Sequence, residues 1–185
     1  MAMKNYRYIE RRNMMIRRIG IWVGEIAAAI LLAFLLIQFC VQTVTIHGES
    51  MQPTFSDGDV LLVNKIGFRL KDPHRMDLVL LEIENGTTTH YTVKRVIGLP
   101  GEKIKISEGK IFINGKEQKI SFEEEILSAG LAAYEIELGE DEYFVMGDNC
   151  NNSEDSRVAN IGNIKRTQFV GKIAGRIKKG TSEKH

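Results

Sequence analysis

The pattern of apolar and polar residues changes sharply near residue 45. Residues 26–41 read IAAAILLAFLLIQFCV without one charged side chain, and the apolar character extends back to Ile19. A run of this length is sufficient for a helix to cross a bilayer. The pattern therefore predicts a transmembrane anchor helix at 19–44, preceded by a tail at 1–18.

After this run the pattern becomes that of strands. The stretches at 59–66 (DVLLVNKI) and 77–83 (DLVLLEI) are rich in Val, Leu and Ile and begin at aspartates. In EKIKISEGKIFINGK at 102–116, isoleucine alternates with polar residues on both arms, which predicts a hairpin. We therefore expect a mainly β fold: a β-rich domain of antiparallel sheets at 45–178, followed by a polar tail at 179–185.

One stretch of this domain has no clear strand pattern. Residues 116–142 carry many acidic side chains and no basic one after Lys119. Such a run is typical of a solvated acidic surface, with room for a short helix.

The distribution of charge indicates the orientation of the chain in a membrane. The net charge is +1 overall, but the tail at 1–18 holds six basic residues against Glu10. Positive flanks stay in the cytoplasm, so we expect a single-pass cell-membrane protein with its N-terminus inside and its β-domain outside. A cleaved secretory signal is the alternative, although its apolar region is usually shorter. Basic residues confined to a tail also argue against nucleic-acid binding.

No metal or cofactor is expected. Cys40 and Cys150 lie far apart and form no disulfide framework or zinc-binding spacing. The GLPGEK at 98–103 lacks the spacing of a phosphate-binding loop. The polar loop at 147–157 has Ser153 where a calcium-binding loop requires its sixth-position glycine.

Three separated segments carry the chemistry. They are SMQPT at 50–54, YTVKRVIGLPGE at 91–102 and GDNCNNSEDSR at 147–157. In this order, behind an N-terminal anchor, they resemble the type I signal peptidases, and the likeness extends from about Arg11 to Arg157. The resemblance implies a membrane serine endopeptidase without a cofactor. Its partners would be the lipid bilayer and exported preproteins bearing signal peptides, with association with the export machinery also possible.

The resemblance also assigns roles to individual residues. It makes Ser50 the nucleophile and Lys94 the general base of a serine-lysine dyad. Ser153 matches the serine that orients the lysine, while Asp155 and Arg157 support the site. A lysine can accept a proton near neutral pH only if burial lowers its pKa. Lys94 shares strand parity with an apolar valine two residues later, which is compatible with an inward-facing side chain.

Two residues beside Ser50 complete the expected site. Gly48 replaces a serine whose hydroxyl contributes to the oxyanion hole in some family members, which leaves the Ser50 N–H as the expected donor. Met51 is expected to line the substrate pocket. Ser50 lies nine residues after Val41, which limits its reach from the anchor to roughly 30 Å.

Other classes of function remain possible from the sequence. A serine-histidine hydrolase would pair Ser50 with His47, His74 or His90, but no nucleophile-elbow motif is present. A membrane-anchored binding module would explain the anchor and the β-domain without any chemistry. A self-cleaving repressor protease would carry a DNA-binding domain in place of the anchor.

Overall fold

The computed structural model describes residues 2–85, 88–120 and 122–180. It divides into two compact units, Met1–Cys40 and Val41–His185, each described here by itself. The elements follow one another as α1 (Ala2–Cys40), β1 (Val41–Thr45), β2 (Val60–Asn64), α2 (Gly67–Leu70), β3 (Leu78–Asn85), β4 (Thr88–Gly98), β5 (Lys103–Ser107), β6 (Lys110–Ile113), β7 (Lys116–Glu117), η1 (Gly130–Ala133), β8 (Ile136–Glu137), β9 (Glu142–Met146), β10 (Ile164–Lys165), η2 (Arg166–Gln168) and β11 (Phe169–Lys178). Of the predicted tail at 179–185, residues 181–185 lie outside the described residues.

The first unit is one long helix, α1, which ends earlier than the predicted anchor. It stops at Cys40, and Val41–Thr45 forms strand β1, paired antiparallel with β2. Four of its five residues are Val or Thr, which favours a strand over a helix, because β-branched side chains fit a pleated surface. In the part of the chain that is described, no helix is long and apolar enough to qualify as a membrane span.

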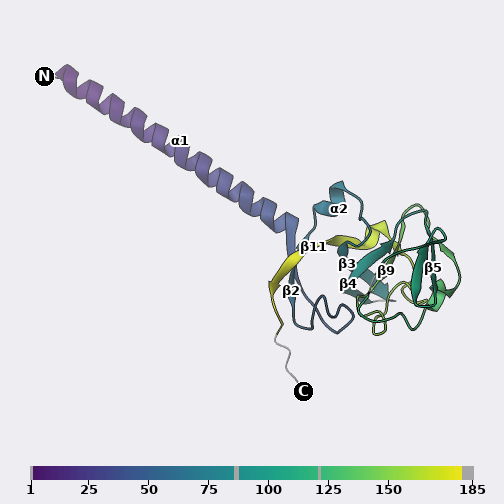
Figure 1. The fold of residues 1–185 in the computed structure, drawn as a ribbon. Helices are drawn as coiled ribbons and strands as arrows, with labels where there is room; N and C mark the ends of the chain where they lie inside the picture. Colours follow the sequence, from purple (N-terminus) through teal and green to yellow (C-terminus); the bar gives the residue numbers. More distant parts are fainter. Residues whose placement is uncertain (1, 86–87, 121, 181–185) are drawn as a thin grey trace. The chain divides into compact units, whose positions relative to one another are not determined.

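The second unit is mainly β and antiparallel, as predicted. A seven-stranded sheet has the order β1-β2-β11-β3-β4-β9-β10, and a four-stranded sheet has the order β7-β6-β5-β8. The last strand, β11, lies between β2 and β3 and pairs with both (Figure 1). The strands predicted at 59–66 and 77–83 are β2 and β3, which form neighbours of β11 in this sheet.

The predicted hairpin at 102–116 is confirmed as β5 and β6. Glu108 and Gly109 both have positive φ at its turn, and a second tight turn at Asn114–Gly115 leads into β7. The four isoleucines of this hairpin are buried in one cluster with Phe144 and residues of the acidic segment. That segment contains the short 3-10 helix η1 and buries apolar side chains between its acids.

Candidate active site

Ser50 lies on a loop whose two ends are fastened together. The Ile46 N–H donates to the Asp59 carbonyl at 2.8 Å, and the Gly58 N–H donates to the Ile46 carbonyl at 3.0 Å. Met51 is only 1% exposed and anchors the loop in an apolar cluster, while Ser50 next to it is half-buried. The loop thus presents Ser50 at the surface from a fixed base.

Lys94 lies on β4 and is 4% exposed, an inward position with which its strand parity is compatible. Its Nζ donates to Ser153 Oγ at 3.0 Å. Burial lowers the pKa of Lys94, although the carboxylates of Asp155 and Glu154 oppose this shift. The charge of Arg157 acts in the same direction as burial. The net result is a lysine that loses its proton more easily than one in water.

Gly147 lies where Ser50 and Ser153 approach each other. A side chain at this glycine would collide with both Ser153 Oγ and the Ser50 carbonyl oxygen. The Ser50 carbonyl also accepts the Asn149 N–H at 3.1 Å. Within the described residues no hydrogen bond joins Ser50 Oγ to Lys94 Nζ directly. The structure therefore brings the lysine, through Ser153, to the edge of the nucleophile loop.

Asp155 and Arg157 form a buried ion pair behind this cluster. Arg157 Nε and Nη2 donate to the two carboxylate oxygens at 2.8 and 2.9 Å, and the pair is at most 5% exposed. The same carboxylate accepts the Gly147 N–H at 3.0 Å. Arg157 also donates to the carbonyls of Ser128 and Cys150. The pair therefore fixes the turn that holds Ser153, which agrees with the supporting role expected for it.

A second, partly buried ion pair was missed in the sequence. Arg95, next to Lys94, donates to Asp148 through Nε at 2.6 Å and Nη2 at 2.5 Å. Asp148 also accepts the hydroxyl of Thr54, four residues after Ser50. This pair therefore links all three motif segments. The sequence did contain a signal for this pair, because Arg95 and Asp148 carry opposite charges in two of the motif segments and neither had been given a role.

The main-chain N–H of Gly48 already has an acceptor within the protein, whereas an oxyanion-hole donor must be free to bind the substrate. Gly48 has a φ of +90°, and its N–H donates to Asp57 Oδ1 at 2.8 Å. The Ser50 N–H has no acceptor among residues 2–85, 88–120 and 122–180. Gly48 therefore shapes the approach to the nucleophile, and the Ser50 N–H remains available for a developing oxyanion.

A small cavity of about 60 Å³ lies beside Ser50. Met51, the predicted substrate-binding residue, lines it together with Val44, Thr45, Ile46, His47, Leu80, Tyr91, Thr92 and Val93. On the same side, β4 pairs with β9 only from Arg95 onward, so its edge at Thr88–Lys94 has no strand partner among the described residues. An extended peptide could therefore add to this edge with small side chains in the cavity.

The candidate groups for other chemistry are not assembled in the same way. His47 lines the small cavity but makes no hydrogen bond to Ser50 in the described chain. His74 is not a lining residue of this cavity, and its Nδ1 lies 3.9 Å from Asp77 Oδ2. The described residues contain no cluster of three or more His, Cys, Asp or Glu side chains arranged for a metal ion. Cys150 is buried, and burial raises the pKa of its thiol, which disfavours the reactive thiolate.

Comparison with known proteins agrees with this geometry. The family model described as signal peptidase, peptidase S26, matches residues 19–177. This chain belongs to the signal peptidase family. The resemblance found in the sequence is thereby confirmed, together with the activity class of the family, the removal of signal peptides by a serine endopeptidase.

Individual members of the signal peptidase family show the extent of the similarity. Signal peptidase I P of Bacillus subtilis subsp. natto is 37% identical over 158 residues, which cover 81% of this chain and 84% of that protein. Signal peptidase IB of Staphylococcus aureus (strain N315) is 30% identical over 184 residues, covering 89% and 92%. The crystal structure of a signal peptidase I from Enterococcus faecalis V583 has a TM-score of 0.44 and 26% identity, covering 55% of this chain and 97% of that one.

Proposed function

We propose that this family member cleaves preproteins through a dyad of Ser50 and Lys94. The observation that carries the proposal is the environment of Lys94. A buried lysine with a lowered pKa lies beside the nucleophile loop and is held by Ser153 Oγ rather than by a carboxylate. A neutral amine in this position can act as a general base, which an exposed ammonium cannot do.

The reaction follows from these positions. Lys94 Nζ takes the proton of Ser50 Oγ as the oxygen attacks the scissile carbonyl carbon. The Ser50 N–H donates to the oxyanion that forms. Lys94 then gives its proton to the leaving amine, which departs as the N-terminus of the mature protein. Water, deprotonated by Lys94, hydrolyses the remaining ester and releases the signal peptide as a carboxylate.

In this reaction Ser153 positions the base. It holds Lys94 Nζ at 3.0 Å in the free enzyme, and a small rotation of the lysine side chain transfers the contact to Ser50. Catalytic hydrogen bonds often form fully only when substrate is bound. Asp155 and Arg157 keep the Ser153 turn in place through Gly147.

The direct test compares detergent extracts of the wild type and of Ser50→Ala on a test preprotein, with mapping of the new N-terminus. Cleavage should disappear in Ser50→Ala, while His90→Ala should retain most activity. His90 lies on the exposed part of β4. Loss of activity in His90→Ala would transfer the role of the base to a serine-histidine mechanism. Cleavage retained in Ser50→Ala would instead require another nucleophile.

The small cavity supports selection of small side chains. A volume of about 60 Å³ suits alanine, and alternate residues of an extended strand point to the same side. We therefore propose alanine as the preferred residue at the first and third positions before the cut. A bulky aromatic residue at either position should lower kcat/KM far more than one at the second position. Equal tolerance at all three positions contradicts binding along the β4 edge.

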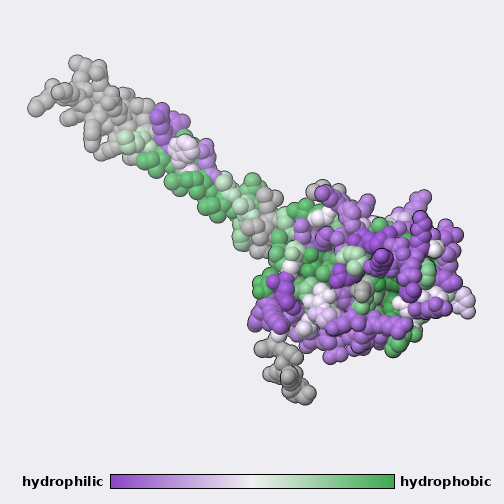
Figure 2. All heavy atoms as spheres, viewed as in Figure 1, coloured by the Kyte–Doolittle hydropathy of each residue, from purple (hydrophilic) through white to green (hydrophobic). Residues whose placement is uncertain are grey.

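A membrane anchor that begins at Ile19 and the topology around it are part of this proposal. The anchor was expected at 19–44, but its helix ends with α1 at Cys40. Many described side chains of α1 are apolar and more than half exposed, as Figure 2 shows along the helix. They include Ile19, Trp22, Val23, Ile26, Ile30, Leu31, Leu32 and Phe34. Such a surface favours lipid over water. The bilayer is then the partner of α1, and the export machinery delivers preproteins to the enzyme.

In this topology the tail at 1–18 is cytoplasmic, and the domain at 45–178 with its tail at 179–185 lies outside. Basic residues flanking an apolar run favour this orientation. Protease added to intact cells without their wall should digest the β-domain and spare the N-terminal tail. A protected β-domain would contradict the proposed orientation.

A further inference from the structure

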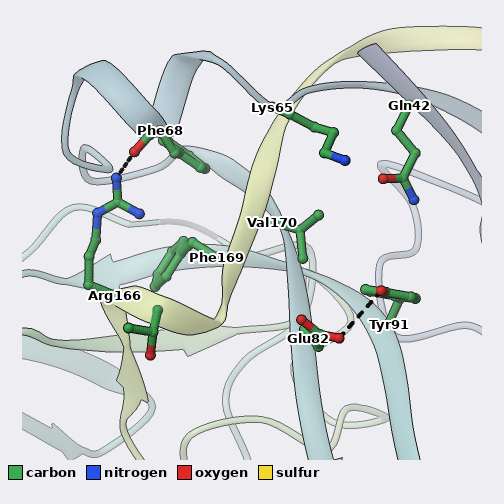
Figure 3. Close-up of a pocket in the computed structure, with 9 residues that line it drawn as sticks. Gln42, Lys65, Phe68, Glu82, Tyr91, Arg166, Phe169 and Val170 are labelled. Carbon is green, nitrogen blue, oxygen red and sulfur yellow. Dashed lines mark hydrogen bonds between the residues drawn. The ribbon is translucent and has the colours of Figure 1, made fainter. Parts of the chain in front are cut away.

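A cavity much larger than the one beside Ser50 lies elsewhere in the β-unit. It has a volume of about 590 Å³, some ten times that of the small cavity beside the nucleophile. Figure 3 shows its lining. The walls come from β1, the end of β2, α2, β3, β4, η2 and β11, through Gln42, Lys65, Phe68, Glu82, Tyr91, Arg166, Thr167, Phe169 and Val170. The mechanism described above uses none of these side chains.

Tyr91 connects this cavity to the active site. It lines both the large cavity and the small one beside Ser50. It also lies on the part of β4 that has no strand partner on the side away from β3. A peptide extended along this edge, with its scissile carbonyl at Ser50, therefore continues past Tyr91 into the large cavity.

The lining of the large cavity suits a larger, less polar side chain than alanine. Val170 and the largely buried rings of Phe68 and Phe169 form the apolar part of the lining, and Tyr91 remains 53% exposed. Polar side chains form the rest of the lining, and among them Glu82 Oε1 accepts the hydroxyl of Tyr91 at 3.4 Å. The Lys65 side chain has no hydrogen-bond or ion-pair partner within the described residues, and Figure 3 shows its ammonium pointing toward Gln42. Such donors suit the main-chain carbonyls of an extended peptide.

The spacing along β4 indicates which substrate residue reaches the cavity. Tyr91 lies three residues before Lys94, which corresponds to roughly 10 Å of strand, or three to four residues of an extended peptide. Side chains alternate between faces, so the first, third and fifth residues before the cut point the same way. The first and third occupy the small cavity. The fifth then arrives at Tyr91.

We propose that the large cavity is a specificity pocket for the fifth residue before the cleavage site, and that it prefers a bulky apolar side chain such as leucine. The inference rests on the proposed cleavage by Ser50 and Lys94. It adds a second selection rule: small residues beside the scissile bond, and a large apolar residue where the signal peptide approaches the enzyme.

The test uses the full-length protein in detergent and two preproteins that differ only at the fifth position, leucine or alanine, both with alanine at the first and third. The wild type should cleave the leucine substrate with a kcat/KM roughly five- to tenfold higher, since an open cavity buries only part of the three additional carbons. Thr167→Trp, at an exposed residue of the lining, should bring this ratio close to one. Lys105→Trp, an equally exposed change on β5 away from the cavity, should keep the wild-type ratio.

Gln42→Trp narrows the cavity from the opposite wall and should reduce the ratio independently, so the test does not depend on one variant folding. A ratio near one in the wild type, or a wild-type ratio in both folded tryptophan variants, overturns the pocket assignment while Ser50-dependent cleavage stands. If neither substrate is cleaved, or if Ser50→Ala cleaves them, the proposed function fails first. Weaker binding of Thr167→Trp than of the wild type to phosphatidylglycerol micelles, with its leucine preference intact, would instead make the cavity a lipid headgroup site.

Discussion

One region of each sheet buries a different kind of residue. The hairpin of the four-stranded sheet buries its four isoleucines, which alternate with less buried lysines, Ser107 and Phe112. Around the end of β9, by contrast, β4 of the seven-stranded sheet and the loop that follows β9 bury a lysine, an arginine and two aspartates: Lys94, Arg157, Asp148 and Asp155. Burying charged groups costs free energy that aliphatic packing does not. The difference indicates that the first region is built for stability and the second for chemistry.

Replacing Lys94 should separate stability from catalytic activity most strongly. Lys94→Met removes the only lysine that is buried among the described residues and keeps a similar length, so activity should fall by about 10³-fold or more. The melting temperature should not fall, because an apolar side chain suits the site better than an ammonium. Lys94→Arg should be equally inactive, since arginine cannot release its proton. Near-normal cleavage by Lys94→Arg would refute the assignment.

Wild-type kcat/KM should also rise with pH through the lowered pKa of Lys94, because only the neutral amine can accept the Ser50 proton.

Breaking the ion pair should destabilise the site region. Asp155→Ala leaves Arg157 buried without its carboxylate, which should lower the free energy of unfolding by about 3–5 kcal/mol and release Gly147. Denaturant unfolding measures the loss. Glu154→Ala is the matched control, because its carboxylate has no such partner in the described chain, and it should change stability little. Equal losses in the two variants would show that the ion pair is not what fixes this turn.

The pH dependence of stability should also distinguish the two regions. The folded-state pKa of Lys94 is lowered, while the unfolded chain keeps the ordinary value near 10.4. Between these two values the unfolded state binds more protons, so Lys94 makes stability rise with pH by at most about 1.4 kcal/mol per pH unit. Below the lowered pKa the slope vanishes. The free energy of unfolding of the wild type minus that of Lys94→Met, measured at several pH values, should isolate the contribution of Lys94. A difference that falls as the pH rises between these two pKa values would contradict the prediction.

The smallest effect should come from the aliphatic region. Ile104→Val removes the terminal methyl group that packs near Gly98, which should cost about 0.5–1.5 kcal/mol. Cleavage per folded molecule should be unchanged, because no group of the dyad is touched. Unfolding and activity measured on the same preparation test both statements. A loss of kcat without a loss of stability would link this sheet to catalysis.

The sequence predicted the regular parts of the fold well and the long-range parts poorly. The β5–β6 hairpin follows from local alternation and turn residues, so neighbouring residues contain the whole signal. The place of β11 between β2 and β3 depends on pairing between distant segments, and no local pattern encodes it. The predicted anchor ended at residue 44, whereas α1 ends at Cys40. The prediction was too long because Val41 and Val44 of β1 continue the apolar run.

The predictions of site residues show the same contrast between local and long-range information. The burial of Lys94 was expected from the resemblance, with which its strand parity is compatible, and Ser153, Asp155 and Arg157 were selected by the same resemblance. The link between Arg95 and Asp148 was not predicted, because each residue reads alone as a surface charge and only the fold brings them together. The large cavity was not predicted either, since its walls come from seven elements spread along the chain.

The central position of the last strand has a consequence for biosynthesis. Among the described residues, the β1–β2 ribbon, which precedes and follows the Ser50 loop, has no main-chain pairing with the β3–β4 ribbon that carries Lys94, and β11 joins the two. Residues 169–178 follow all the other strands of this sheet in the sequence, so a ribosome synthesises them after those strands. The nascent chain therefore cannot complete this sheet between its nucleophile and its base until β11 has left the ribosome. The order of translation thus delays proteolytic competence until this strand has been made.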